Sequence, residues 1–248
     1  MTQDFAAGNY RYIPAVFQYS SGVAANADFE IERVRFDTWM PLAEGFKRAA
    51  DYISAAGRPL TAFCACELRS PSVVDEAGFR TFNEQYVKTL AEWAIFDGTN
   101  NPVARSNVCP EVGPPTAPSF YAFSFTRAKP QSMPTFVIAG GAEARDGAGS
   151  YPERIVRYRE TGPDAILAKA KATLGSMERR LAAFDHAWKD TTAVQVYSVC
   201  DFYHAVAHEI VERGAARSGL TWHFARPPVV DLDFEMDCRR VAREIIIE

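Results

Sequence analysis

The sequence has no uninterrupted apolar run near the roughly 20 residues that a membrane-spanning helix needs, although 48% of its 248 residues are hydrophobic. It also lacks an excess of positive charge, because 27 lysines and arginines stand against 31 acidic residues and give a net charge of -4. Nucleic acids and anionic membranes select basic surfaces, so we expect neither as a partner. The opening MTQDFAAGNY lacks the basic and apolar parts of a signal peptide, and we therefore expect a cytoplasmic protein.

Patterns that bind metals are scarce as well. The five cysteines are scattered and do not form the two close pairs of a zinc tetrad, and the four histidines show no H-E-x-x-H arrangement. His204 and His208 are four residues apart in a helix-like segment, but such a pair alone is weak support for a shared metal. We expect neither a metal nor an organic cofactor.

What the chain does contain is an internal repeat, because its second half follows the order of its first half. The matched segments are the apolar runs 15–25 and 135–144, the helix-like segments 41–57 and 163–184 that open at a proline, the β-rich runs from Thr61 and Thr192, the second helices 79–93 and 201–214, and the strand-like segments 118–128 and 231–237. The order β-α-β-α-β-β therefore occurs twice. This predicts an α+β fold of two units, residues 1–130 and 131–248, each a mixed β-sheet with two helices on one face.

Four acids alternate with apolar residues in DLDFEMD, residues 231–237. Strict alternation is typical of a half-buried strand, on which the four carboxylates would stand in a row about 6 to 7 Å apart. Three interpretations remain open: a solvated outer face, a cation site, or a polar cleft in which one carboxylate does chemistry. The first half has FYAFSF at the matching place and no acid there.

Short motifs in both halves resemble those of one known family. Residues 79–86, FRTFNEQY, have the form F-x-x-x-N-x-x-Y; residues 102–106, PVARS, and 216–218, ARS, have a common arginine; Ser21-Gly22 follows an apolar run; and residues 234–237 read FEMD. In this order they resemble the Rid (YjgF-type) proteins, which are enamine and imine deaminases. The chain is most similar to the two-unit members that act on 2-aminomuconate or 2-amino-5-chloromuconate.

The resemblance implies roles for individual residues. Arg105 or Arg217 would bind a substrate carboxylate, and Glu235 would orient and deprotonate a water and then return the proton to the leaving nitrogen. The substrate-binding residues would be Ser21, Gly22, Asn83 and Tyr86. The same residues have structural alternatives: the arginines could form ion pairs, Asn83 could satisfy backbone groups, Tyr86 could pack its helix, and Asp231 and Asp233 could be solvated.

Each half lacks part of this set, since the second half has Gly140-Gly141 in place of Ser-Gly and lacks the Asn-x-x-Tyr helix. A complete site would need Ser21 of one unit beside Glu235 of another. The resemblance then implies a homotrimeric, cofactor-independent hydrolytic deaminase of a small enamine dicarboxylate in aromatic-amine catabolism. Two alternatives remain: a non-catalytic ligand-binding protein, or a chorismatase-like hydrolase that acts on another unsaturated acid.

Overall fold

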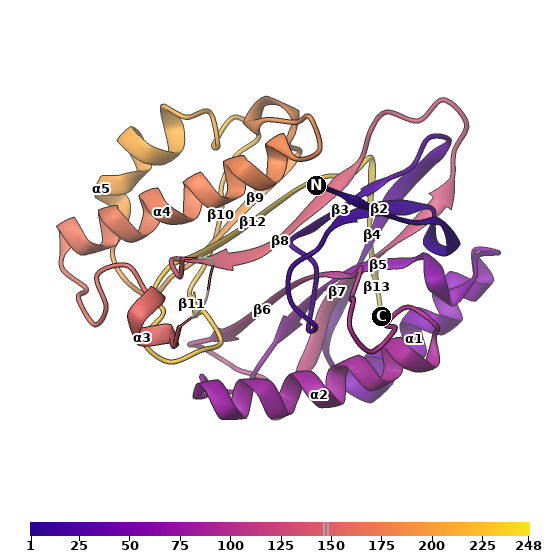
Figure 1. The fold of residues 1–248 in the computed structure, drawn as a ribbon, viewed down its shortest axis with the longest axis horizontal. Helices are drawn as coiled ribbons and strands as arrows, with labels where there is room; N and C mark the ends of the chain where they lie inside the picture. The colour runs from indigo at the N-terminus through magenta and orange to yellow at the C-terminus, as the bar shows by residue number, and fades with distance from the viewer. Residues whose placement is uncertain (146, 148) are drawn as a thin grey trace.

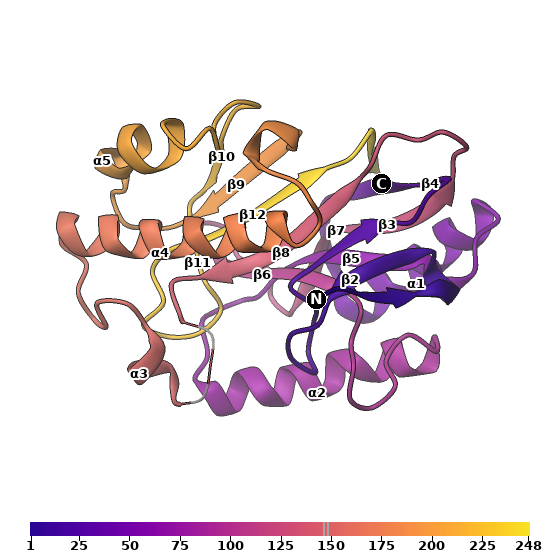
Figure 2. The ribbon, with the colours of Figure 1, turned by 45° about the horizontal axis from the view of Figure 1, so that its top comes forward.

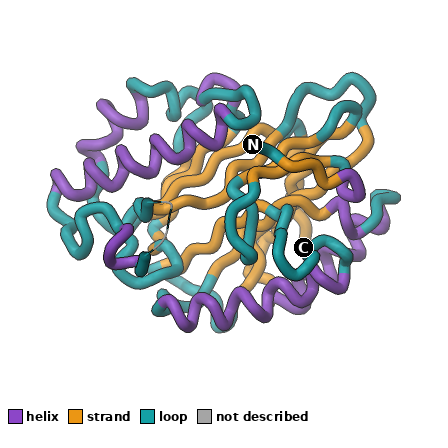
Figure 3. The backbone as a smooth tube through the Cα atoms, viewed as in Figure 1, coloured by secondary structure: helices purple, strands orange, loops and turns teal. Residues whose placement is uncertain are grey.

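Two mixed β-sheets lie between two layers of helices in the computed structural model, which describes residues 1–145, 147 and 149–248 (Figures 1 and 3). The first sheet contains, in spatial order, β1 (Gln3–Phe5), β2 (Tyr10–Ile13), β3 (Gly22–Ala25), β8 (Phe136–Ala142), β12 (Glu235–Arg240), β9 (Ala193–Tyr197) and β10 (Thr221–His223). The second sheet contains β11 (Ala225–Arg226), β6 (Ala104–Pro110), β5 (Phe63–Arg69), β7 (Ser119–Ala128), β4 (Phe29–Pro41) and β13 (Arg243–Ile247).

The helices cover one face of each sheet. They are α1 (Leu42–Ala55), α2 (Glu76–Glu92), α3 (Tyr151–Arg154), α4 (Pro163–Ala182) and α5 (Tyr203–Ala205), which continues as a π-helix over Val206–Val211; single 3-10 turns span Ala6–Gly8, Leu60–Ala62 and Trp188–Asp190. Figures 1 and 2 show α4 and α5 beside the first sheet, and α1 and α2 beside the second. No helix of the described residues is long and apolar enough to span a membrane.

Local sequence explains where the long helices begin and what they bury. Pro163 opens α4, where its fixed φ suits the first turn and its missing N–H costs no hydrogen bond. The Asp75 side chain caps α2 by accepting a hydrogen bond of 2.7 Å from the Gly78 N–H. The buried side of α4, which includes Leu174 and Met177, packs against apolar residues of the first sheet.

The strand order repeats, as the internal repeat predicts. The order β6-β5-β7-β4 in the second sheet corresponds to β10-β9-β12-β8 in the first sheet. The expected division between residues 130 and 131 falls in the loop between β7 and β8. The halves also exchange strands, because β3 pairs with β8 in the first sheet, while β11 pairs with β6 and β13 pairs with β4 in the second.

The space between the two sheets contains buried polar residues beside an apolar cluster to which both sheets contribute. Arg33 forms an ion pair of 2.6 Å with Glu67, and the Gln195 side chain donates to Asp237 at 2.8 Å. All four of these residues are buried. Buried charges must be paired or hydrogen-bonded to be tolerated. The Arg33–Glu67 pair lies within the second sheet and the Gln195–Asp237 bond within the first, whereas the Ser106 hydroxyl of β6 donates across the two sheets to Asp237 of β12 at 2.6 Å. The functional cavity opens at one end of this space.

The predicted strand over residues 231–237 is wrong in its first half. Asp231 has a left-handed φ of 68°, and β12 begins only at Glu235. The cause is Glu143 of the segment after β8, whose carboxylate accepts the backbone N–H groups of Asp233 and Phe234 at 2.7 and 3.1 Å. These N–H groups are therefore not used in a strand ladder, and the four acids do not stand in one row.

Candidate active site

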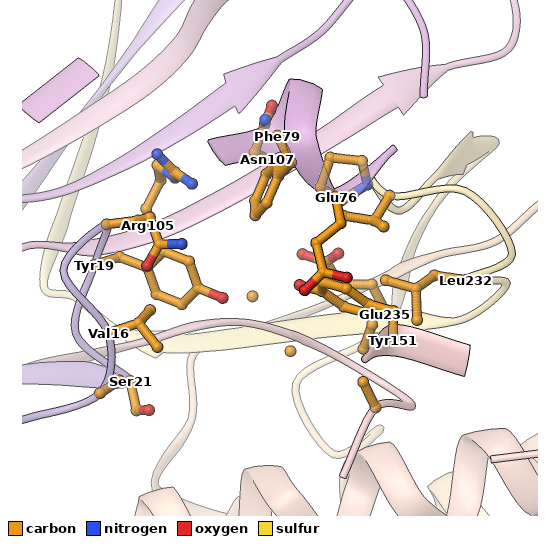
Figure 4. Close-up of a pocket in the computed structure, with 18 of the residues that line it drawn as sticks. Val16, Tyr19, Ser21, Glu76, Phe79, Arg105, Asn107, Tyr151, Leu232 and Glu235 are labelled. Atoms are coloured by element: carbon orange, nitrogen blue, oxygen red, sulfur yellow. The ribbon is translucent and has the colours of Figure 1, made fainter. Parts of the chain in front are cut away.

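A cavity of about 290 Å³ lies at the junction of the two halves. The loop between β2 and β3 contributes Tyr19 and Ser21, β6 contributes Arg105, β12 contributes Glu235, and α3 contributes Tyr151 and Arg154. Figure 4 shows Arg105, Tyr19 and Ser21 on one side, with Glu235 and Tyr151 on the other. Ser21 and Glu235, which the sequence places in different units, thus line one cavity within a single chain because β3 joins the sheet of the second half.

Arg105 presents an unpaired guanidinium group. The residue is 3% exposed, and both Nη1 and Nη2 are buried without a hydrogen-bond partner among the described residues. Its Cζ lies 4.7 Å from the ring centroid of Tyr86, 5.1 Å from that of Tyr19 and 5.5 Å from that of Phe82. Aromatic faces stabilise a cation but accept no directed N–H bonds comparable to those of a carboxylate. The geometry therefore leaves the two ends of the guanidinium group available to an anion in the cavity.

The loop that holds Tyr19 and Ser21 is hydrogen-bonded to the segment immediately before β6. Ser20 donates from its backbone N–H to the Val103 carbonyl at 2.8 Å and from its hydroxyl to the Pro102 carbonyl at 3.0 Å. The Asn101 side chain donates to the Gln18 carbonyl at 2.9 Å. These bonds fix the Tyr19 ring beside Arg105.

Glu235 is a buried carboxyl group that is neutral at neutral pH. Burial raises its pKa to about 8, and the nearby acids Asp237 and Glu143 add to the effect. No hydrogen bond joins the Glu235 carboxyl to another residue of the described chain. A neutral carboxylic acid can donate a proton and, once ionised, can accept one, which are the two abilities of a general acid–base catalyst.

Gly140 makes room for this carboxyl group. A Cβ at Gly140 would lie 2.2 Å from Glu235 Oε1 and 3.1 Å from the Ser106 Cα, so a side chain there would displace the Glu235 carboxyl group. The Gly140 N–H donates to Ser106 Oγ at 3.1 Å, and that hydroxyl donates to Asp237 Oδ2 at 2.6 Å. The glycine that replaces the serine of the Ser-Gly motif in the second half therefore has its own function, which is to admit Glu235.

The acids of residues 231–237 have four different environments. Asp231 accepts hydrogen bonds from the Tyr158 hydroxyl at 3.0 Å and Arg159 Nε at 3.3 Å, outside the cavity. The expectation that Asp233 is solvated is wrong, because the fully buried Lys169 donates to it at 2.7 Å. Lys169 also donates to Glu143 at 3.1 Å, so this ion-pair cluster anchors the chain immediately before Glu235.

Asp237 is the most extensively hydrogen-bonded of the four. Its carboxylate accepts from Gln195 at 2.8 Å, from the Tyr197 hydroxyl at 2.8 Å and from Ser106 at 2.6 Å. It lies behind Glu235 in the polar layer between the sheets and does not line the large cavity.

Three other residues with a predicted role in substrate binding lie beside the cavity without lining it. Gly22 is in β3, where a Cβ would come within 3.1 Å of Ile138 and the Val137 carbonyl. Tyr86 is buried, shares a hydrogen bond of 3.2 Å with Cys66 Sγ and packs under Arg105. Asn83 is fully buried in α2, and neither atom of its amide has a hydrogen-bond partner in the described chain.

Arg217 is not brought to the site. The second helix of this half ends in a π-helix and a series of turns, so Arg217 is exposed in a turn and the next strand, β10, starts at Thr221. The similarity of residues 216–218 to the segment that contains Arg105 therefore does not extend to their structure, since Arg105 lies in β6. Cys66 pairs with Arg105 in β5 and β6, whereas Tyr197, at the same distance after the repeated Thr-Ala, pairs with His223 in β9 and β10. His223 thus occupies the position that corresponds to Arg105.

Residues that the sequence interpretation missed include Tyr19, Tyr151, Arg154 and Arg180. Tyr19 precedes the Ser-Gly motif by two residues, and that proximity was the only signal for it. Tyr151 and Arg154 lie between the repeated elements and match no motif. Arg180 is on α4, where its Nη1 donates to the Ala139 carbonyl at 2.9 Å. In the part of the chain that the structure describes, no cluster of three or more His, Cys, Asp or Glu side chains is arranged to hold a metal.

The architecture and this cavity define a two-unit α+β protein in which an arginine and a neutral glutamic acid face one cavity. The chain belongs to the family of 2-aminomuconate deaminase CnbZ, which matches residues 2–245. It is 46% identical over 245 residues to a 2-amino-5-chloromuconate deaminase of Comamonas testosteroni, covering 98% of each chain.

A solved structure with a TM-score above 0.5 shares its fold. A chorismatase matches with a TM-score of 0.54 at 13% identity, covering 90% of this chain and 77% of its own. The E. coli YjgF protein, at 16% identity and a TM-score of 0.33, covers 44% of this chain and 81% of its own. The predicted family relationship and the predicted α+β fold are confirmed.

Proposed function

We propose that the protein is a cofactor-independent hydrolase that removes the amino group of a 2-aminomuconate-type enamine dicarboxylate. The observation that carries this proposal is the pair formed by Arg105 and Glu235. Arg105 is a desolvated cation whose Nη atoms have no hydrogen-bond partner among the described residues, and Glu235 is a carboxyl group in the same cavity with a pKa raised to about 8. The 46% identical 2-amino-5-chloromuconate deaminase supports the choice of substrate class.

Arg105 anchors the carboxylate next to the amino-bearing carbon. Its planar guanidinium group can make two parallel charge-assisted hydrogen bonds to a carboxylate, and it stays charged at every working pH. Because both Nη atoms are buried without a hydrogen-bond partner among the described residues, the anchor breaks no hydrogen bond to these residues when the substrate enters. Ser21 lines the same cavity and can donate a hydrogen bond to the substrate or to the attacking water.

Glu235 moves the protons. As an acid it protonates the enamine carbon, which converts the substrate to an iminium ion. As a carboxylate it takes a proton from water while the water oxygen bonds to the former amino-bearing carbon. It then transfers this proton to the nitrogen, and the carbon–nitrogen bond breaks with release of ammonia. The remaining hydroxyl proton returns to Glu235 as the carbonyl forms, so the enzyme regains its starting state.

The net reaction consumes one water and produces one ammonia and one 2-oxo acid, or its 2-hydroxy enol tautomer. General acid–base catalysis of this kind contributes typically 10² to 10⁴ in rate. All of the proton transfers use one residue with a pKa of about 8, which lies close to physiological pH.

The test is product analysis with purified protein and 2-aminomuconate. We expect loss of the ultraviolet absorbance of the conjugated substrate together with one equivalent of ammonia. Pyruvate without ammonia from an enol-ether substrate such as chorismate would favour the chorismatase-like alternative, to which the fold is similar. Binding of a dicarboxylate without turnover of any enamine would favour a non-catalytic ligand-binding protein.

The setting of the reaction is part of the same proposal. We expect a cytoplasmic homotrimer that acts in the degradation of aromatic amines, and that accepts the 5-chlorinated substrate as well as the unsubstituted one. Light scattering measures the assembly, and the ratio of kcat/KM values for the two substrates measures the preference.

A further inference from the structure

Four arginines of the described chain line the cavity, and they differ in their ion-pair and hydrogen-bond partners. Arg80 is an exposed residue of α2 and forms an ion pair of 3.1 Å with Glu84. Arg180 donates to backbone carbonyls of β8. Arg105 and Arg154 form no ion pair with any residue of the described chain. Arg105 and Arg154 are therefore cations of the cavity for which the described residues provide no carboxylate partner.

Arg154 has the features of a binding residue. Its Nε is buried without a hydrogen-bond partner among the described residues, and its Nη1 makes a single long bond of 3.4 Å to the Arg145 carbonyl. Its guanidinium group stacks on the Tyr151 ring with Cζ 4.6 Å from the centroid. Tyr151 lies across the cavity from Arg105 (Figure 4). The stacking holds Arg154 in place while its N–H groups stay available.

Arg105 and Arg154 both act electrostatically on the hydroxyl group of Tyr19, which lines the cavity. Burial raises the pKa of the Tyr19 hydroxyl, while the charges of Arg105, Arg180 and Arg154 act against this rise. Among the described residues, two acids line the cavity: Glu235, whose pKa is raised to about 8, and Glu76, which is exposed on the first turn of α2. A ligand with one carboxylate balances one cation, whereas an extended dicarboxylate balances both.

We propose that Arg154 binds the second carboxylate of the substrate, the one far from the amino group, and so makes the site selective for dicarboxylates over monocarboxylates. This inference rests on the proposed function for the identity of the substrate. Arg217, which the sequence resemblance offered beside Arg105 for binding a substrate carboxylate, lies outside the cavity. Arg154 of α3 binds the second carboxylate in its place.

The test compares two non-reactive ligands that differ by one carboxylate, muconate (hexa-2,4-dienedioate) and sorbate (hexa-2,4-dienoate), by calorimetric titration of the full chain. We expect the wild type to bind muconate more tightly than sorbate. Arg154→Gln should weaken muconate binding by roughly 10- to 100-fold, the range for one charge-assisted hydrogen-bonded contact, and leave sorbate binding within about twofold. Arg154→Lys should retain part of the preference for muconate.

Arg157→Gln is the matched control, because Arg157 is exposed three residues further along and pairs with Glu160 outside the cavity. It should bind both ligands like the wild type. The proposal is overturned if the wild type does not prefer muconate, or if Arg154→Gln weakens both ligands equally or neither. Binding of muconate that depends on Arg154, without ammonia release from 2-aminomuconate, would refute the proposed function and leave the carboxylate site standing.

Discussion

Replacing Asp237 with asparagine should shift the pH dependence of the reaction, because Asp237 is a charged neighbour that raises the pKa of Glu235. The two residues are next-but-one on β12, which puts them roughly 6.6 Å apart at the usual strand rise. At an effective dielectric constant of about 20, two full charges at this separation interact by about 2.5 kcal/mol, or nearly 2 pKa units. Hydrogen bonds from Ser106, Gln195 and Tyr197 to the Asp237 carboxylate spread its charge, and we expect a shift of about 1 to 2 units.

The direction in which the pH profile of kcat/KM shifts depends on which form of Glu235 starts the reaction, and this is the protonated form. In the wild type, kcat/KM should be highest below pH 8 and fall as the pH rises through the Glu235 pKa of about 8. Without the Asp237 charge the Glu235 pKa is lower, so the fall in Asp237→Asn should begin 1 to 2 units earlier. The assay is ammonia release across pH, since kcat/KM reports the ionisation of the free enzyme.

Asp231→Asn is the control for this experiment. Asp231 belongs to the same acidic stretch but pairs with Arg159 outside the cavity, and asparagine tolerates its left-handed φ of 68°. Its pH profile should match that of the wild type. If the fall of kcat/KM at high pH stays in place in Asp237→Asn, or moves to higher pH, then this fall does not report the ionisation of Glu235 and the assignment is refuted.

Two further predictions concern how Glu235 is positioned. Gly140→Ala should lower kcat by roughly 10²-fold, because the new Cβ would lie only 2.2 Å from Glu235 Oε1 and would displace the carboxyl group. Gly162→Ala is the control, because a Cβ at Gly162 would meet nothing within 4 Å. Equal activity of the two variants would contradict the role of Gly140. Lys169→Met should lower the free energy of unfolding by about 3–5 kcal/mol, since it leaves Glu143 and Asp233 without their buried partner. Urea denaturation measures this loss of stability. In the double variant Lys169→Met/Glu143→Gln part of the stability should return, because one of the two unpaired carboxylates is removed. A loss under about 1 kcal/mol in the single variant, or no gain in the double variant, would count against the ion-pair cluster.

Much of the fold is readable from local patterns. The helices that open at prolines, the α2 helix and the strands of the two similar sheets follow from periodicity and from the repeated Thr-Ala segments. These features depend on residues that are close in sequence. The exchange of β3 and β13 between the sheets depends on pairing between distant segments, and no local pattern encodes it.

The site was predictable where residues match a family motif. Arg105 and Glu235 were predicted because they stand in segments that resemble motifs of the Rid family, and the structure brings both to one cavity. The alternation in residues 231–237 misled, since Glu143, about 90 residues earlier, takes the backbone N–H groups that a strand would need. Arg154 could not be found, because it lies on a four-residue helix between the repeated elements and only the tertiary structure brings it to the cavity.

The most direct test of the central claim is ammonia release from 2-aminomuconate by Glu235→Gln beside the wild type and the Asp231→Asn control. Glutamine keeps the size of the side chain but can neither donate nor accept the proton in question. We predict a loss of 10² to 10⁴ in kcat with the control unchanged and with similar binding of muconate in all three proteins. Full activity in Glu235→Gln would contradict the assignment of the proton transfers to Glu235.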